Sequence, residues 1–266
     1  MIYLGTIGRM VGMKSPSSQQ LGLDDRYSFE TTLEGIRKGT VRPIGRRSWA
    51  LQTSDATTPA EQASLMGFAL GEWGPGPFCF VSADAPVTNL LSPHASLAME
   101  TIGSEVSVGG PVELGSDGVA GASLNRASAG GIFFGADFVP VLAETPVAGS
   151  AWVQGEDPKV ALYWYDASLS FLSASTSPGH SSAGMKRESV TAVPPVNAVA
   201  CRLVALGTIV AARPAITWTS DPFSWAAGEG CPRAVLHGVS KGLVMASADP
   251  RGGRYANMSY TVTEVG

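Results

Sequence analysis

Four aromatic residues carry the clearest ligand-binding signal in the sequence: Trp152, Tyr163, Trp164 and Tyr165. Aromatic faces bind the C–H face of pyranose sugars, so these rings are candidates for a glycan platform. On an extended strand, successive side chains point to opposite faces, which separates Trp164 from Tyr163 and Tyr165. Only one of these faces can line a binding site, so we expect most of the four residues to belong to the core.

Residues suited to catalysis or to metal binding are scarce. The chain has three histidines, and no two of them are close in sequence. Cys231 and His237 are the nearest Cys–His pair, and without a third ligand nearby they do not predict a zinc site. A calcium ion held by loop oxygens from Asp157, Asp166 and Asp221 stays open, although no D-x-D-x-D run is present. The sequence predicts no enzyme, no cofactor and no other metal site.

The charge pattern argues against nucleic acid or a membrane as a partner. The net charge is −4, and the densest basic group, Arg42–Arg47, is explained by a solvated strand end. No apolar run reaches the length of about 18 residues that a membrane-spanning helix requires. The segment Met1–Ile7 lacks the basic and apolar regions of a secretory signal, so we expect a first strand there.

The three cysteines point to a reducing compartment. Cys79, Cys201 and Cys231 are widely spaced, and their odd number argues against a disulfide framework. We expect buried thiols, as suits a protein made in a cytoplasm. A single Cys201–Cys231 bridge stays open.

The composition predicts an all-β fold. Charged residues make up only 15% of the chain, whereas 32 glycines and 18 prolines supply turns. Short strand-like segments at intervals of about 8–12 residues are typical of a sandwich or jelly roll. The clearest of them are Ser150–Gly155, Lys159–Asp166, Arg187–Thr191, Ala198–Val204 and Ala215–Thr219.

The first part of the chain predicts further strands and a single helix. Tyr27–Glu34 alternates apolar and polar residues as a half-buried strand does, and Arg46–Thr53 and Phe78–Val81 are also predicted strands. Ile2–Gly12 is expected to be one strand, and Lys14–Gln20 a loop. Thr58, Pro59 and Glu61 form a capping box that starts a helix, and Gly71 is placed to end it.

Three blocks follow from these patterns. Residues 1–88 form an N-terminal β domain, of sandwich or split-barrel type, with one short helix. Residues 89–222 form a jelly-roll sandwich. Residues 223–266 hold strands that include Tyr255–Val265, and this block is too short to fold alone. It either completes the jelly roll or pairs back with the first domain, and the sequence leaves both open.

The middle block resembles carbohydrate-binding-module-type jelly rolls. The resemblance lies in Ser150–Gly155, Leu162–Asp166, Arg187–Thr191 and Ala192–Pro195, and it covers about half of the chain. Lys186 and Arg187 stand where that pattern often has Trp-Arg, so one core aromatic residue is missing or displaced. The resemblance implies a sandwich that binds a surface ligand and performs no chemistry.

The whole chain also resembles minor tail proteins of phages that infect actinobacteria. This resemblance lies in the opening strand, the strand Arg46–Leu51, the junction Asn89–Pro93 and the ending Ser259–Gly266. The first block is similar to the ring-forming domain of distal tail proteins. The resemblance implies a virion protein that assembles in the host cytoplasm as a homo-oligomeric ring, expected to have sixfold symmetry.

Two functions are therefore expected. In the first, the protein is a structural component of a phage tail tip, with tail tube, tape measure and baseplate hub as its partners, and it displays the jelly roll. In the alternative, it is a carbohydrate-binding module protein that adheres to host cell-surface glycans through some of the four aromatic residues named first.

Overall fold

The computed structural model describes residues 1–23, 27–41, 46–53, 57–110, 122–180, 184–221, 225–246 and 254–265. Within this part of the chain the fold is all-β, as the composition predicts, with sixteen strands and two helices. Two compact units are present: unit 1 comprises residues 1–6, 11–80 and 233–266, and unit 2 comprises residues 7–10 and 81–232. Unit 2 is thus inserted within the sequence of unit 1. Positions 42–45 of the arginine group lie outside the described residues.

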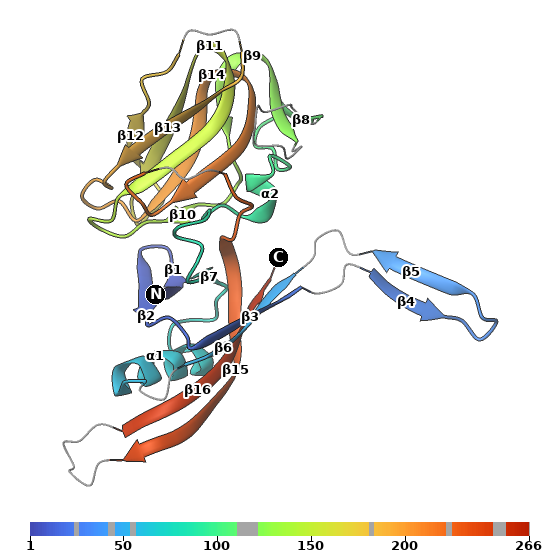
Figure 1. Cartoon of the computed structure of the whole chain (residues 1–266), viewed down its shortest axis with the longest axis vertical. Coiled ribbons are helices and arrows are strands. Elements are labelled where there is room, and N and C mark those ends of the chain that lie inside the picture. Colours follow the sequence, from blue (N-terminus) through green and yellow to red (C-terminus); the bar gives the residue numbers. More distant parts are fainter. Residues whose placement is uncertain are drawn as a thin grey trace. The chain divides into compact units, whose positions relative to one another are not determined.

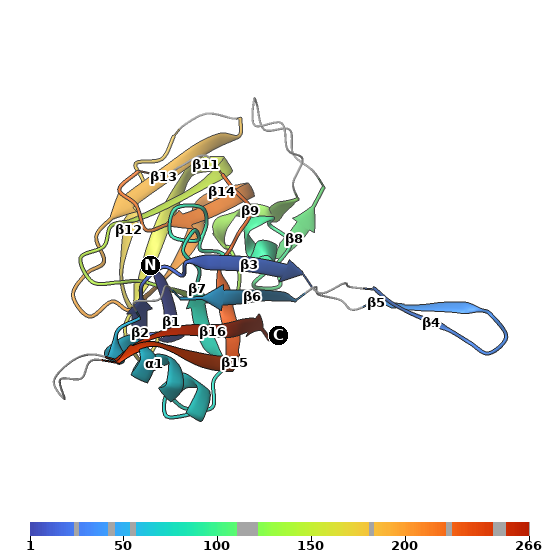
Figure 2. The same ribbon diagram turned by 60° about the horizontal axis from the view of Figure 1, so that its bottom comes forward.

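Unit 1 is built on a seven-stranded sheet with the strand order β2-β1-β7-β15-β16-β6-β3 (Figure 2). Its strands are β1 (Ile2–Thr6), β2 (Arg9–Met13), β3 (Ser18–Leu23), β6 (Arg47–Gln52), β7 (Phe78–Val81), β15 (Cys231–Ala246) and β16 (Arg254–Glu264). Two expectations were wrong here. The strand expected over Ile2–Gly12 is a hairpin, with Gly8 in the left-handed region at φ +81°. Ser18–Gln20, expected in a loop, begin β3 because they pair with β6.

The core of unit 1 lies on one face of β6 and β16. Trp49 and Leu51 alternate with exposed or half-buried neighbours on β6, and they are 3% and 2% exposed. On the antiparallel partner β16, Val262 lies opposite Trp49 and Tyr260 lies opposite Leu51. The predicted strands Arg46–Thr53, Phe78–Val81 and Tyr255–Val265 are therefore present. The last strand, whose partner the sequence left open, lies between β15 and β6.

Helix α1 (Pro59–Leu70) confirms the capping-box prediction. The Thr58 side chain accepts a hydrogen bond from the Glu61 backbone N–H, and the Glu61 carboxylate accepts one from the Thr58 backbone N–H at 3.0 Å. Gly71 ends the helix in the left-handed conformation, at φ +79°. Leu65 and Phe68 are buried, as their spacing predicts, whereas Ala69 of the same predicted stripe is exposed.

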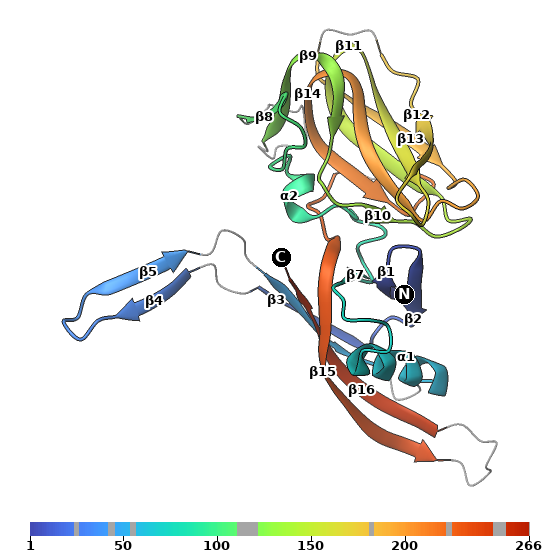
Figure 3. The ribbon, with the colours of Figure 1, turned by 180° about the vertical axis from the view of Figure 1, so that it is seen from behind.

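Strands β4 (Tyr27–Thr31) and β5 (Arg37–Val41) form a separate two-stranded hairpin (Figure 3). The expectation of a half-buried strand over Tyr27–Glu34 was wrong. Phe29 is 56% exposed and Leu33 is fully exposed. In the described part of the chain, β4 and β5 pair only with each other, so no further strand covers these apolar side chains.

Unit 2 is built on a second seven-stranded sheet, which is strongly curled (Figure 1). Its strands are β8 (Val106–Gly109), β9 (Ser123–Phe133), β10 (Val139–Pro140), β11 (Val147–Tyr165), β12 (Phe171–Thr176), β13 (Lys186–Ala192) and β14 (Ala200–Thr217). A second helix, α2 (Pro93–Ser96), was not predicted. The sequence suggested two strands within 150–166 and two within 198–219, but each pair belongs to one long strand, β11 or β14.

The turn residues within β11 and β14 produce a shared bend rather than a break. A Cβ atom on Gly155 would lie 2.1 Å from the carbonyl oxygen of Gly207, so this close approach requires glycine. Beyond the bend the sheet faces itself, because a Cβ atom on Gly149 would lie 2.6 Å from Cδ1 of Leu203 and 3.0 Å from Cδ2 of Leu162. The two halves of one sheet thus enclose a sandwich-like core.

The three cysteines all lie in the described part of the chain and are buried thiols. The Cys201–Cys231 bridge that the sequence left open is not formed. Burial raises the pKa of the Cys201 thiol far above its ordinary value, so this thiol stays protonated and unreactive.

The cap of α1 offers a test of unit 1. We expect Thr58→Ala to destabilise unit 1 by about 1 kcal/mol, because the Glu61 backbone N–H loses its partner. Thermal unfolding followed by circular dichroism measures the change. Thr58→Ser keeps the hydroxyl group and should unfold like the wild type. Equal stability of the Ala variant and the wild type would contradict the cap.

Candidate functional site

Strand β11 separates the four aromatic residues singled out in the sequence. Trp164 is 1% exposed in the core of unit 2, and its indole N–H donates to Ser175 Oγ at 3.0 Å. Tyr163 and Tyr165 lie on the opposite face, where Tyr163 is half-buried and Tyr165 is 9% exposed. Trp152 is half-buried in the half of the strand that precedes the bend at Gly155. The buried position of Trp164 corrects the expectation that it could contact a ligand.

The two tyrosines belong to a cluster of rings that we call the aromatic face. Tyr163 lies 5.2 Å from Phe171 and 5.9 Å from Phe133, measured between ring centroids. Tyr165 lies 4.8 Å from Phe138 and 6.1 Å from Phe171. Most of these contacts are edge-to-face or tilted, the geometry that aromatic rings prefer. The aromatic face thus consists of Phe133, Phe138, Tyr163, Tyr165 and Phe171, from β9, β11, β12 and the segment before β10.

Arg202 of β14 holds the aromatic face together. It lies directly opposite Tyr163 in the register of β11 and β14. Its guanidinium carbon lies 4.7 Å from the ring centroid of Phe133 and 5.3 Å from that of Phe138, within the range of cation–π attraction. The Nη2 group donates a hydrogen bond to the Gly135 carbonyl at 2.7 Å. The cation therefore fixes two rings and the segment between them.

Burial also affects the chemistry of the face. Burial raises the pKa of Tyr165, and the positive charge of Arg202 opposes this effect only in part. The Tyr165 hydroxyl group therefore stays neutral at ordinary pH and can act as a hydrogen-bond donor or acceptor.

The exposed part of the face is Phe171, whose side chain is 55% exposed. A tight turn carries it: Asp166 Oδ1 accepts hydrogen bonds from the backbone N–H groups of Ser168 and Ser170, both at 2.9 Å. A hydrogen bond from the Ser168 hydroxyl, joined by the two backbone bonds, lowers the pKa of Asp166. The turn thus presents an apolar ring beside a charged carboxylate.

Sequence reasoning missed four members of this site: Phe133, Phe138, Phe171 and Arg202. Phe171 begins a strand in which it is followed by Leu172 and then only by small residues, so the strand lacks apolar alternation. Arg202 lies within a predicted strand, and its position between two apolar neighbours could have marked the face that it shares with Tyr163.

The structure gives the open calcium site no support among the described residues. Asp157 forms an ion pair with Lys159 at 2.6 Å, and Asp166 is engaged in its own turn. In this part of the chain, no group of three or more His, Cys, Asp or Glu side chains is placed to hold a metal ion. His180 and Glu188 form a buried pair at 2.9 Å within unit 2.

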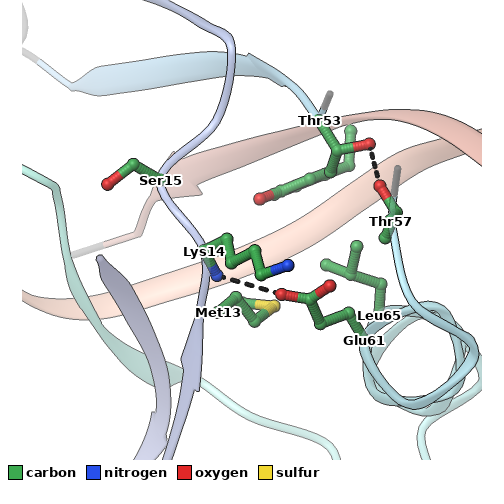
Figure 4. A pocket seen from close by; sticks show the side chains of 8 residues that line it. Met13, Lys14, Ser15, Thr53, Thr57, Glu61 and Leu65 are labelled. Atoms are coloured by element: carbon green, nitrogen blue, oxygen red, sulfur yellow. Dashed lines mark hydrogen bonds between the residues drawn. The ribbon is translucent and has the colours of Figure 1, made fainter. Parts of the chain in front are cut away.

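A small cavity lies in unit 1 beside α1 (Figure 4). Its volume is about 20 Å³, which is room for one water molecule and not for a substrate. Glu61 faces it and accepts a hydrogen bond from the Lys14 backbone N–H at 3.2 Å. Partial burial would raise the pKa of Glu61, but hydrogen bonds from Thr58 and Lys14 lower it overall. The carboxylate has a capping role, which explains its place here.

A larger hollow of about 640 Å³ lies open beside β8 and β9 in unit 2. Most of its lining residues are polar or charged, and Arg126 there forms an ion pair with Glu105 and donates to the Gly131 carbonyl at 2.8 Å. Its charged groups are engaged with the protein itself, which makes the aromatic face the better candidate site.

No helix in the described residues is long and apolar enough to span a membrane.

Comparisons with known proteins give only distant likenesses. No family model and no curated protein matches the chain. The enzymatically active domain of tailspike protein 4 of bacteriophage CBA120 is similar with a TM-score of 0.37 and 11% identity, over 50% of this chain and 22% of that one. The CBM22-1–GH10 modules of Clostridium thermocellum xylanase 10B, solved with xylohexaose, give a TM-score of 0.34 and 15% identity, over 47% and 27%.

A carbohydrate-binding module of Cellvibrio mixtus lichenase 5A, solved with cellotriose, gives a TM-score of 0.27 and 10% identity, over 64% of this chain and 94% of that one. The chain spans 22% and 27% of the length of the first two matched structures. At these identities the likeness concerns the β-sheet fold alone.

Truncation to alanine should lower the stability of unit 2 much more at Trp164 than at Phe171. We expect Trp164→Ala to destabilise unit 2 by about 3–5 kcal/mol, because it leaves a large cavity in the core. Phe171→Ala removes an exposed ring and should cost less than about 1 kcal/mol. Urea denaturation followed by near-ultraviolet circular dichroism compares the two variants. Similar losses in both would contradict the assignment of Trp164 to the core.

Proposed function

We propose that the protein is a structural component of a phage tail tip that assembles with copies of itself through unit 1 and displays unit 2. The hairpin β4–β5 carries this proposal. A two-stranded hairpin is marginally stable alone in water, and this one exposes Phe29, Leu33 and Ile36. Exposed apolar groups of this kind mark contact surfaces. A neighbouring subunit would supply the cover that the described chain does not.

The edge strand β3 supports the same proposal. Leu21 lies opposite buried Trp49, yet Leu21 is 51% exposed. Leu23 lies opposite buried Arg47 and is 72% exposed. The apolar face of the sheet therefore continues to its edge without cover. An uncovered edge strand is also a template for pairing with another chain.

The identity of the assembly rests on the resemblance of the chain to minor tail proteins of phages, and of its first block to the ring-forming domain of distal tail proteins. On this proposal the copies form a ring, expected to be sixfold, in contact with the tail tube, tape measure and baseplate hub. The protein would assemble in the host cytoplasm and reside in the virion.

Disrupting the hairpin tests the assembly. We expect the wild type to elute as a ring-sized oligomer in size-exclusion chromatography with light scattering. The triple variant Phe29→Ser, Leu33→Ser, Ile36→Ser should shift to monomer, because it removes the apolar contact surface. Val193→Ser with Val196→Ser, at exposed apolar positions of unit 2 (58% and 87% exposed), is the matched control and should leave the oligomer intact. A wild-type protein that is monomeric at every concentration would refute ring assembly.

A second function, glycan binding by unit 2, is favoured by the aromatic face. Phe171 is exposed beside half-buried Tyr163, and Arg202 fixes the surrounding rings. Rigid aromatic surfaces beside polar groups are typical of sugar sites. This function is compatible with the first, because a displayed sandwich can contact the host surface.

Glycan-array binding tests the second function. We expect binding that is lost in Phe171→Ala, because the exposed stacking surface disappears, and retained in Phe171→Trp. Val196→Ala, at an exposed apolar position that is not a member of the aromatic face, should bind as the wild type does. Binding that is indifferent to Phe171→Ala would locate the glycan elsewhere.

A further inference from the structure

Arg202 is a half-buried cation that forms no ion pair with another described residue. The ion pairs of the described residues do not include it, and its Nε atom is buried without a hydrogen-bond partner among them. Asp166 directly follows β11, and its Oδ1 atom accepts three hydrogen bonds within its own turn. Glu100 accepts a hydrogen bond from the Ala136 backbone N–H at 3.0 Å, next to the carbonyl that Arg202 contacts. Asp137 precedes Phe138 in the same segment. Among the described residues, no carboxylate therefore lies within ion-pair distance of the Arg202 guanidinium group.

A partly desolvated charge costs free energy unless an anion or enough hydrogen-bond acceptors pair with it. A half-buried cation loses part of its hydration, and cation–π contacts with two rings and one carbonyl acceptor offset only part of that loss. A guanidinium group matches a carboxylate or phosphate group in charge and in planar donor geometry. The rings beside Arg202 offer an apolar surface to the same ligand.

We propose that the aromatic face binds an acidic sugar, with the pyranose ring against Phe171 and Tyr163 and the negative group directed toward Arg202. This inference rests on the proposed glycan binding and extends it by naming the ligand class. A uronic acid and a sugar phosphate share the required chemistry, a single negative group on a pyranose ring. A neutral sugar would use the rings but leave Arg202 without its anion.

Matched pairs of sugars test the charge preference. Methyl β-D-glucuronide and methyl β-D-glucoside differ only at C6, as do the corresponding galacturonide and galactoside, and glucose 6-phosphate represents the phosphate source. Titration followed by NMR shifts of the ring signals of Phe171 and Tyr163 gives each Kd. We expect the acidic member to bind about tenfold more tightly at low salt, as one charge-assisted pair would give. The preference should shrink as NaCl is raised, because salt screens exposed charges.

Variants of Arg202 separate charge from scaffolding. Arg202→Gln should bring the ratio of the two Kd values within each matched pair close to one, because the charge that favours the acidic member is removed. Arg202→Lys keeps the charge and should retain part of the preference. Arg202 also contacts Gly135 and two rings, so the Gln variant could lose structure. In that case the salt dependence of the wild-type preference tests the role of charge without a substitution.

Each outcome of the titrations decides a different point. Equal affinity for both members of each pair overturns the acidic-sugar inference and leaves glycan binding intact. Binding of none of the probes overturns both. Tight binding of the phosphate but not of the uronides supports the inference with a sugar phosphate as the source.

Discussion

The antiparallel pairing of β11 with β14 is the interaction on which unit 2 depends. The two strands contain 19 and 18 residues, and their register runs from Ala148 opposite Thr217 to Tyr165 opposite Ala200. They bend together where Gly155 approaches Gly207, so that one sheet encloses its own core. In the half of β11 that follows the bend, simple alternation places Leu162 and Trp164 on one face and Tyr163 and Tyr165 on the other. The fold and the candidate site thus share one cause.

The same pairing explains why the aromatic face carries a charge. The register sets Arg202 opposite Tyr163, and the neighbouring β9 brings Phe133 over the guanidinium group. A residue that would otherwise be a solvated surface cation becomes a fixed part of a ring cluster. In unit 1 a different constraint applies, because the exposed leucines of β3 and the hairpin β4–β5 lack cover in the described chain. The binding proposed for unit 2 and the assembly proposed for unit 1 therefore rest on separate surfaces.

The sequence predicts those features that depend on interactions between residues close together in the chain. The capping box of α1 follows from Thr58, Pro59 and Glu61, and the buried face of β6 follows from the spacing of Trp49 and Leu51. The length of β11 could not be foreseen, because Gly155 and Asp157 have the composition of a turn although their backbone continues a bent strand. Long-range packing also decides burial. Phe29 alternates as a core residue would, but it is 56% exposed in a hairpin that pairs with no other strand of the described chain.

In the candidate site, too, local sequence predicts some features and long-range strand pairing sets the others. Alternation alone predicts that Trp164 and Tyr163 lie on opposite faces, whereas Arg202 and Phe171 join Tyr163 only through strand pairing. Hydroxyl-radical footprinting with mass spectrometry measures directly which rings reach solvent. If β11 is placed as described, Phe171 is oxidised rapidly while Trp164 stays protected in the folded protein. Rapid oxidation of Trp164 together with protection of Phe171 would contradict the arrangement on which both the fold of unit 2 and its site depend.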